Sequence, residues 1–450
     1  MGGVFGVSTQ QENAQSLTYY ALYAIQHRGQ FGCGIASDHN GYIDYEKGHG
    51  LVTNVLKDDV LRLLRGKIAI GFVSNSQTYI PALEMNPKVI GYGKGVMGVV
   101  FDGHLLNYDE LKGIVDDCGV NYEHISHPEI VANLIAIHYN GDIIEAIKKT
   151  LQLVKGAYSF LLMTDNRLIL ARDRYGIKPL VLGKLEDGYM VSSETCSFDA
   201  VGGSYLRDIV PGEMVIIEGN RLYEEQLFKP LCNRSCIFEA IYYARPDSIL
   251  NGKSIYRMRI NSGKQLAKRN DISADVVIGA PDSGMVAAIG FAEEAKIPYG
   301  IGIIKNRYVG RTFIERDQND RIDKVRIKLN VLRENVEGRD IIVVDDSIVR
   351  GTTMTRTVKM LRDAGAKTVH VRIASPKVYH VCELGVNQSV SGKMIAATHS
   401  TEEIRKLIGA DSLMFMSIED TLESFGLNNS FCTGCLDKQY PIELEATDED

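Results

Sequence analysis

Apolar residues follow two different patterns along the chain, and the change falls near residue 230. In the first half, short apolar stretches predict β-strands at residues 4–7, 67–73, 96–101, 157–163 and 168–172. Three longer stretches have the i, i+3, i+4 spacing of amphipathic helices, and they cover residues 17–27, 129–138 and 143–154. Strands thus come before helices, an order that predicts sheets layered with helices and not a simple βαβ alternation.

The second half alternates strands and helices. The predicted elements, in that alternation, cover residues 274–279, 285–295, 300–304, 339–344, 353–364 and 368–373. Such alternation predicts a mostly parallel sheet with helices on both faces. A chain of 450 residues is long enough for two cores, so we expect an α+β domain at residues 1–230 and an α/β domain at residues 231–450.

Composition and charge narrow the class of protein. The chain is 45% hydrophobic and 24% charged, with a net charge of −7, so a broad basic surface for nucleic acid is not expected. No apolar run approaches the roughly 18 residues of a membrane span. The N-terminal residues also lack the profile of a signal peptide. We therefore expect a cytoplasmic protein that binds neither nucleic acid nor membrane.

The strongest candidate site follows the predicted strand at residues 339–344. Asp345 and Asp346 stand at its C-terminal end, the edge at which open parallel sheets bind ligands. The loop that leads into the next helix is rich in backbone donors and hydroxyls, with Ser347, Val349, Arg350, Gly351, Thr352 and Thr353. Successive N–H groups at a helix start bind phosphate, and the hydroxyls are expected to add hydrogen bonds and to cap the helix.

This segment resembles the phosphoribosyl pyrophosphate (PRPP) motif of type I phosphoribosyltransferases. The resemblance implies that the two acids serve the ribose hydroxyls and Mg²⁺ and that the loop holds the 5′-phosphate. Carboxylates and substrate phosphates are the ligands that Mg²⁺ prefers. The implied metal ligands are Ser283, Asp345 and Asp346.

Two further segments narrow the resemblance to the glutamine PRPP amidotransferase family, also called the amidophosphoribosyltransferases. Asp282, Ser283 and Gly284 resemble its pyrophosphate loop, and residues 305–313 resemble its flexible lid. Cations of such a lid neutralise the departing pyrophosphate, here from Lys305, Arg307 and Arg311. The lid departs from the family pattern at Arg316, where the family often has Pro.

The resemblance extends along nearly the whole chain. Matching segments include Gln26-His27-Arg28-Gly29-Gln30, Gly156-Ala157-Tyr158, Ser193-Glu194-Thr195-Cys196 and Ala244-Arg245-Pro246-Asp247-Ser248. The family implies an N-terminal-nucleophile (Ntn) hydrolase-like αββα sandwich followed by a type I phosphoribosyltransferase domain. It also implies a role in purine biosynthesis, a homo-oligomer (commonly a tetramer) and inhibition by purine nucleotides.

Four of the eight cysteines form a candidate metal site. Cys432 and Cys435 make a Cys-x-x-Cys pair, which by itself indicates metal or redox chemistry only moderately. Cys236 and Cys382 lie in segments that resemble the family members with a 4Fe-4S cluster, so all four ligand positions are filled. The spacing leaves a four-thiolate zinc site open. The resemblance favours the cluster, in a structural role.

The first half resembles a glutaminase that has lost its chemistry. In the family, a Cys after the initiator Met attacks glutamine, and this chain has Gly2 there. Ser74 replaces the Arg that holds the glutamine carboxylate, and Asp102 replaces the Asn that donates to the oxyanion. His127 replaces the Asp that receives the glutamine ammonium. We interpret this half as a naturally decayed glutaminase, in which His27, Arg28 and Gly29 are structural.

These residues lead to one main functional hypothesis and four alternatives. The main hypothesis is a Mg²⁺-dependent transferase that converts PRPP and ammonia into 5-phosphoribosylamine and pyrophosphate. A separate glutaminase could deliver the ammonia, or a different amine could be the acceptor. A non-catalytic PRPP-binding regulator or partner subunit is the alternative from another class. An ordinary glutamine-dependent enzyme disagrees with Gly2, Ser74, Asp102 and His127.

Overall fold

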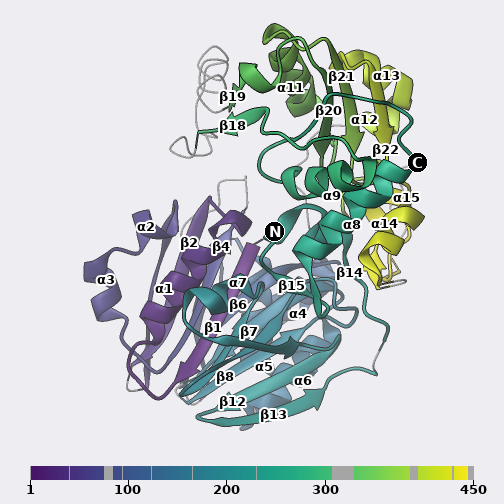
Figure 1. Ribbon diagram of the computed structural model, residues 1–450. Coiled ribbons are helices and arrows are strands. Elements are labelled where there is room, and N and C mark those ends of the chain that lie inside the picture. The colour runs from purple at the N-terminus through teal and green to yellow at the C-terminus, as the bar shows by residue number, and fades with distance from the viewer. Residues whose placement is uncertain are drawn as a thin grey trace.

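The computed structural model describes residues 2–443 except 40, 76–84, 94, 123, 165, 230, 307–328, 386–393 and 428–429. The first half of the chain forms the lower body of Figure 1, and the second half forms the upper body. Their elements meet near the start of β1 and the short strand β14 (Ser235–Cys236).

Two antiparallel sheets make up the first half. The seven-stranded sheet has the order β11-β9-β10-β1-β4-β2-β3, and the six-stranded sheet has the order β13-β12-β8-β7-β6-β5. The first contains β1 (Gly2–Thr9), β2 (Gly32–His39), β3 (Tyr42–His49), β4 (Ile68–Ser74), β9 (Val181–Leu185), β10 (Gly188–Ser192) and β11 (Ser204–Asp208). The second contains β5 (Lys88–Tyr92), β6 (Gly95–Leu105), β7 (Gly156–Met163), β8 (Arg167–Arg172), β12 (Glu213–Glu218) and β13 (Arg221–Gln226).

Helices cover the outer face of each sheet. The seven-stranded sheet carries α1 (Ala14–Ala24), α2 (Val52–Val55), α3 (Asp58–Leu63) and α7 (Cys196–Ala200). The six-stranded sheet carries α4 (Tyr108–Asp117), α5 (His127–His138) and α6 (Ile143–Leu153). Between the sheets, Val4 and Ile70 of one pack with Val100 and Leu161 of the other. The layers are therefore helix, sheet, sheet and helix, which confirms the expected αββα sandwich.

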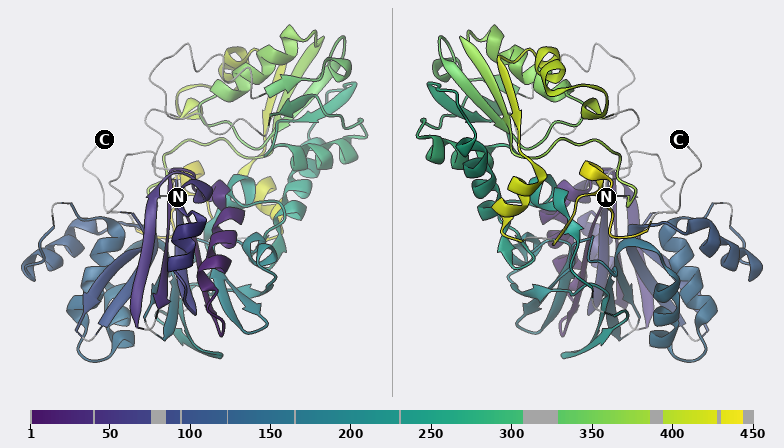
Figure 2. Two further views of the ribbon diagram at one scale, coloured as in Figure 1. Left: turned by 90° about the vertical axis from the view of Figure 1, so that its left-hand side faces the viewer. Right: turned by 90° about the vertical axis from the view of Figure 1, so that its right-hand side faces the viewer.

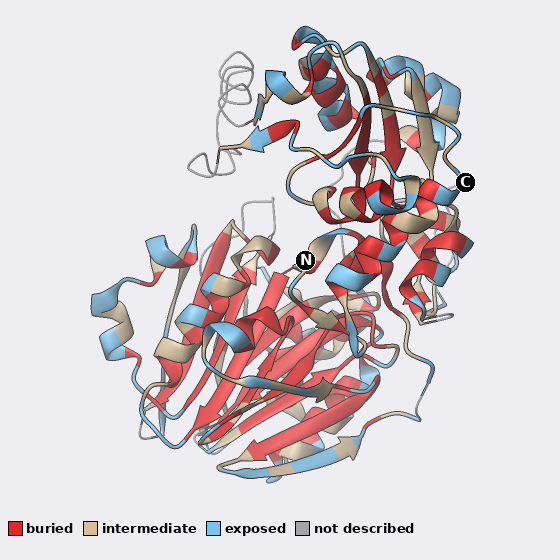
Figure 3. Ribbon diagram, in the orientation of Figure 1, coloured by how far each residue is buried: buried red, intermediate tan, exposed pale blue. Residues whose placement is uncertain are grey.

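The central strands are buried on both faces, as Figure 3 shows in red. Every residue of β7 is buried, so its sequence is nearly continuous in apolar residues and does not alternate. By contrast, α6 buries one face only, and its N-terminus is capped by Asp142, whose side chain accepts a hydrogen bond from the backbone N–H of Ile144.

A four-stranded parallel sheet organises the second half, in the order β17-β20-β21-β22. Its strands are β17 (Val276–Gly279), β20 (Asp340–Asp345), β21 (Thr368–Ile373) and β22 (Ser412–Phe415). One face packs against α8 (Ile255–Lys268) and α9 (Met285–Ala295), and the other against α11 (Thr352–Asp363) and α13 (Thr401–Ile408). Figure 2 shows these helices on either side of the sheet, and α14 (Ile418–Phe425) packs on α8. The expected α/β architecture is confirmed.

The predicted strand at residues 300–304 is only partly correct. The strand β18 (Ile303–Lys305) pairs antiparallel with β19 (Leu329–Val331), and the two form a separate two-stranded sheet. The chain touches the edge of the parallel sheet one step earlier, where Tyr299 bridges Val277. The Gly300 N–H still donates to the Val277 carbonyl at 2.9 Å, and Gly300 and Gly302 lie too close to side chains of β17 to carry side chains of their own.

The first predicted helix also ends earlier than expected. The structure has α1 up to Ala24 and then the 3₁₀ turn η1 (Gln26–Arg28), which places the guanidinium of Arg28 inside the protein. Within the described ranges, no helix is long and apolar enough to cross a bilayer.

The contact between α8 and α9 depends on glycine, and we expect Gly290→Ala to destabilise the protein. An added Cβ would lie 2.8 Å from the Ile260 carbonyl carbon, and Gly263 meets the backbone of Ala287 in the same way. Overpacking of this kind costs about 1–3 kcal/mol. Thermal unfolding should show a lower midpoint. Gly113→Ala is the matched control, since no atom lies within 4 Å of its added Cβ on α4, and it should be neutral or stabilising.

Candidate functional site

The acid pair lies where β20 ends. Asp345 is the last residue of the strand, and Asp346 begins the loop; only 8% and 7% of their surfaces are exposed. The backbone N–H of Asp346 donates to Asp345 Oδ1 at 2.9 Å, and the Ser347 hydroxyl donates to Asp346 Oδ2 at 2.6 Å. Burial and the neighbouring Asp346 carboxylate raise the pKa of Asp345 well above its usual range. Two crowded carboxylates of this kind are suited to bind a cation.

The predicted pyrophosphate loop lies directly beside this pair. The Ala280 N–H donates to the Val344 carbonyl at 2.9 Å, and an added Cβ on Gly284 would lie 2.8 Å from the Cα of Asp345. Any side chain at Gly284 would separate the two loops. Ser283 and Asp346 line one small cavity. The structure therefore brings Asp282, Ser283 and Gly284 together with the acids, from different strands of one sheet edge.

The phosphate loop reaches α11 through Gly351. Gly351 is the N-cap residue with φ +80°, a left-handed conformation that favours glycine. The expectation that hydroxyls cap this helix is wrong, because no side chain caps α11 and Ser347 bonds Asp346 instead. Thr352 and Thr353 are exposed at the helix start, where the first N–H groups of a helix have no partner within the helix. Val349 packs inside the loop, and its carbonyl accepts from the N–H of Ile395.

One lid cation is placed beside the site. Lys305, at the end of β18, forms an ion pair with Asp282 of the pyrophosphate loop. Arg307 and Arg311 lie outside the described residues, as does Arg316. Arg350 is exposed on the phosphate loop.

The four candidate cluster cysteines converge between the two halves of the chain. Cys236 and Cys432 are opposite each other in the parallel pair β14–β23 (Phe431–Cys432), and Cys435 lies in α15 (Gly434–Asp437). The backbone N–H groups of Tyr379 and His380, just before Cys382, donate to the Cys435 carbonyl. Burial raises the pKa of the Cys236 thiol, and the other three thiols are close enough to raise it further. Among the described residues, no three such side chains meet closely enough to hold a single metal ion.

At the expected amide site, the position of the nucleophile is filled. Gly2 begins β1 opposite Ser74 of β4, and the ring of Phe72 lies over it. An added Cβ would be 2.5 Å from Phe72 Cε2 and 2.7 Å from the Val73 carbonyl oxygen. These distances are too short for any real Cβ contact. A cysteine at this position therefore requires the aromatic ring to move.

Two other positions of that site have new partners. The Asp102 carboxylate accepts from Lys178 Nζ at 3.1 Å, and both side chains are buried. Burial works to raise the pKa of Asp102, but the nearby cations outweigh it and the pKa lies below its usual value. His127 Nδ1 accepts from the Leu105 N–H at 3.1 Å, and burial and the neighbouring His104 lower the pKa of His127 to about 4. At neutral pH this histidine is therefore uncharged.

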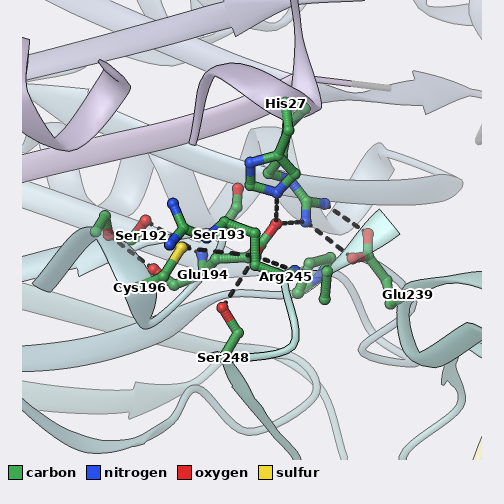
Figure 4. Close-up of polar contacts among 12 residues, drawn as sticks. His27, Ser192, Ser193, Glu194, Cys196, Glu239, Arg245 and Ser248 are labelled. Atoms are coloured by element: carbon green, nitrogen blue, oxygen red, sulfur yellow. Dashed lines mark hydrogen bonds and ion pairs between the residues drawn. The ribbon is translucent and has the colours of Figure 1, made fainter. Parts of the chain in front are cut away.

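A buried ion-pair network joins the amide site to the second half. Arg28 donates to the Gly2 carbonyl through Nε, to Glu194 through Nη1 at 2.5 Å, and to both oxygens of Glu239. Figure 4 shows His27, Arg245 and Ser248 converging on the same Glu194 carboxylate. Glu239 begins the short π-helix η3 (Glu239–Tyr243). Arg28 is thus held by carboxylates from both halves of the chain.

Comparison with known proteins identifies both halves. Residues 85–200 match the glutamine amidotransferase domain family, and residues 249–376 match the phosphoribosyl transferase domain family. The chain is 43% identical to the amidophosphoribosyltransferase of Archaeoglobus fulgidus, over 99% of this chain and 98% of that protein. It is also 43% identical to the amidophosphoribosyltransferase of Bacillus subtilis, over 98% of this chain and 94% of that one.

The chain belongs to the amidophosphoribosyltransferase family. It is accordingly an enzyme of the phosphoribosyltransferase type. The solved structure of the B. subtilis glutamine PRPP amidotransferase with ADP and GMP superimposes with a TM-score of 0.93, at 42% identity and 98% coverage of both chains. The family's two-domain architecture therefore extends over the whole molecule.

Three residues of this amidophosphoribosyltransferase-family chain were missed by sequence reasoning. Phe72 fills the space over Gly2, and Lys178 pairs with Asp102. Arg259 of α8 is buried and lines the same cavity as Asp346. Phe72 carries a usable signal, since it is a bulky aromatic residue two positions before Ser74. Lys178 and Arg259 carry none, because their partners are 76 and 87 positions away in the sequence.

We expect Lys178→Met to destabilise the protein strongly, because it leaves the Asp102 carboxylate buried without its cation. Removing one partner of a buried ion pair costs about 3–5 kcal/mol. Denaturant unfolding measures this loss. The double variant Lys178→Met/Asp102→Asn should recover part of it, since no charge is then stranded. Lys112→Met, in an exposed pair with Asp116, is the control and should change little. If Lys178→Met and Lys112→Met lowered the free energy of unfolding equally, the argument would be contradicted.

Proposed function

We propose that the chain catalyses the amination of PRPP by ammonia in purine biosynthesis and no longer hydrolyses glutamine. The products are 5-phosphoribosylamine and pyrophosphate. Family membership supports the phosphoribosyl transfer, and the rearranged amide site supports the loss of glutamine hydrolysis. The observation that carries the second part is the ring of Phe72 in the space that a side chain at Gly2 would need.

The chemistry at the PRPP site is a displacement at C1 of the ribose. The bond from C1 to the pyrophosphate oxygen breaks, a bond from the ammonia nitrogen to C1 forms, and the nitrogen then loses a proton. Asp345 and Asp346 would bind the ribose hydroxyls and Mg²⁺, with Ser283 as a further metal ligand. Their crowded oxygens fit a hard divalent cation, which would neutralise charge on the leaving pyrophosphate.

The loops around the acids would hold the two ends of PRPP. The N–H groups at the start of α11, with Ser347, Gly351, Thr352 and Thr353, would bind the 5′-phosphate. Val349 and Arg350 belong to the same loop. Lys305 would exchange its ion pair with Asp282 for the pyrophosphate, and Arg307 and Arg311 would add positive charge to the lid.

Four changes in the amide half support the loss of glutamine hydrolysis. Gly2 has no nucleophile, and Ser74 cannot make the bidentate contact of an arginine with a carboxylate. Asp102 is an anion paired with Lys178, so it cannot donate to an oxyanion. His127 is neutral and accepts a backbone N–H, so it offers an ammonium group no negative charge. Gly2, Asp102 and His127 also have structural partners in Phe72, Lys178 and the Leu105 N–H, as expected of natural divergence.

We further propose that Cys236, Cys382, Cys432 and Cys435 hold a 4Fe-4S cluster. Their convergence and burial support a metal group, since a coordinating metal stabilises thiolates that burial would otherwise keep protonated. The spacing of the four cysteines is also compatible with a zinc site, and the resemblance to family members with a cluster favours 4Fe-4S. When bound, the group would pin the C-terminal segment to β14.

Regulation and assembly are proposed from the relatives. The B. subtilis structure contains ADP and GMP, so we propose inhibition by purine nucleotides. We also propose a homo-oligomer, by resemblance a tetramer, with functional domains at residues 1–230 and 231–450.

The deciding experiment is pyrophosphate release from PRPP and Mg²⁺ with ammonium or glutamine as donor, between pH 7 and 9. We expect turnover with ammonium alone, rising by up to about tenfold per pH unit as more ammonia is unprotonated. Asp345→Asn should abolish it. Gly2→Cys should not gain glutamine use, because Phe72 blocks the new side chain. Glutamine turnover by the unmodified chain would refute the proposed loss.

The cluster proposal is tested by purification without oxygen. We expect about four iron and four sulfide per chain, and loss of both in Cys435→Ser. Cys118→Ser is the matched control, because that thiol is exposed and lies outside the group. One zinc ion per chain without iron would contradict the cluster proposal and indicate a zinc site.

A further inference from the structure

A buried arginine that the transfer chemistry does not use lies next to the acid pair. Arg259 stands in the middle of α8 and is 5% exposed. It lines a small cavity together with Ser262, Ser283 and Asp346, and apolar side chains close the rest. A buried guanidinium is costly unless its charge is compensated. A functional or structural role must therefore account for this charge beside the proposed PRPP loops.

Two of its three nitrogens are fixed by backbone carbonyls of one segment. Nε donates to the Ala240 carbonyl at 2.9 Å, and Nη2 donates to the Ala244 carbonyl at 2.7 Å. Both carbonyls belong to η3 or to its C-cap residue. Single π-turns of this kind occur frequently at functional sites. The side chain is thus held rigidly, and in the part of the chain that the structure describes no carboxylate lies within ion-pair distance of it.

Asp346 is the acid that lines the same cavity as Arg259. Burial lowers the pKa of Arg259, and among the charges that oppose this effect the Asp346 carboxylate acts most strongly. The two groups line one cavity, and the hydrogen bonds of the Arg259 side chain go to the Ala240 and Ala244 carbonyls and not to Asp346. A gap between two such polar groups suits a bridging water.

We propose that Arg259 is a positioning residue for phosphoribosyl transfer, which holds the Asp346 carboxylate in the geometry that ribose and Mg²⁺ require. This role rests on the proposed function of the PRPP site. It differs from a purely structural clamp on η3, in which the guanidinium would matter only through its two carbonyl bonds.

The amide half contributes to this arrangement. Glu239, the first residue of η3, accepts two hydrogen bonds from Arg28, whose Nε donates to the Gly2 carbonyl. The segment that fixes Arg259 is therefore itself fixed by the first strand of the other half. A decayed glutaminase half would be retained because the PRPP site depends on it for geometry.

The test is a double-mutant cycle on the full chain, with Arg259→Gln, Asp346→Asn and the double variant. For each variant we would measure kcat and KM for PRPP with ammonium, and the affinity for PRPP with Mg²⁺ by calorimetry. We expect Arg259→Gln to lower kcat/KM by about tenfold or more, and the double variant to be no worse than Asp346→Asn, because the arginine acts through that carboxylate. Arg259→Lys keeps the charge and should recover part of the loss.

Arg257→Gln is the matched control, since Arg257 is an exposed arginine two positions away on α8, and it should match the unmodified chain. Multiplicative losses in the cycle would overturn the proposal, and so would a fall in thermal midpoint with kcat/KM and affinity unchanged. If the unmodified chain binds PRPP but releases no pyrophosphate, the proposed transferase function is wrong. The double-mutant cycle is then calculated from the PRPP affinities of the same variants. Non-additive losses of affinity would still support the positioning role of Arg259. No PRPP binding at all overturns both.

Discussion

The buried guanidinium of Arg28 joins the two halves of this molecule. It binds Glu194 from the first half and Glu239 from the second, and all three side chains are almost completely inaccessible to water. Buried charges are stable only when each has its partner, because removing one of these three side chains leaves the others desolvated and unpaired. The same guanidinium holds the Gly2 carbonyl at the start of β1. The orientation of the amide half and the position of η3 are thus set by one group.

Under the proposed loss of glutamine hydrolysis, that constraint explains how the amide half keeps its fold. The replaced residues of the amide site are not left as gaps. Phe72 occupies the space beside Gly2, Lys178 neutralises Asp102, and His127 accepts a backbone N–H. In that proposal, each of these positions lacks the group expected of a glutaminase and has a packing or electrostatic partner instead. The half therefore remains a stable platform on which η3, and through it Arg259, can be placed.

The proposed PRPP site is built by a different principle, close approach of backbones. Gly284 lets the pyrophosphate loop touch the end of β20, and Gly351 turns the phosphate loop into α11 in a left-handed conformation. The parallel order of the strands brings both loops to one edge of the sheet. Backbone N–H groups and acidic side chains that follow separate strands therefore lie close together at this edge, with no long side chain between them.

The αββα sandwich was implied by the family resemblance. The sequence by itself determined the periodicities, and with them the layering of sheets with helices in the first half, the parallel sheet in the second, and the acid pair at the end of a buried strand. These features are local: side-chain period and the order of carboxylates, glycine and hydroxyls are visible in a dozen neighbouring residues. It did not show that β18 would leave the parallel sheet, that Ser347 would bond Asp346 and leave α11 uncapped, or that Arg28 would bridge to Glu239. Those outcomes were decided by the tertiary structure, because they depend on which distant backbones and charges meet in the same small volume away from water, and sequence spacing carries no information on that distance.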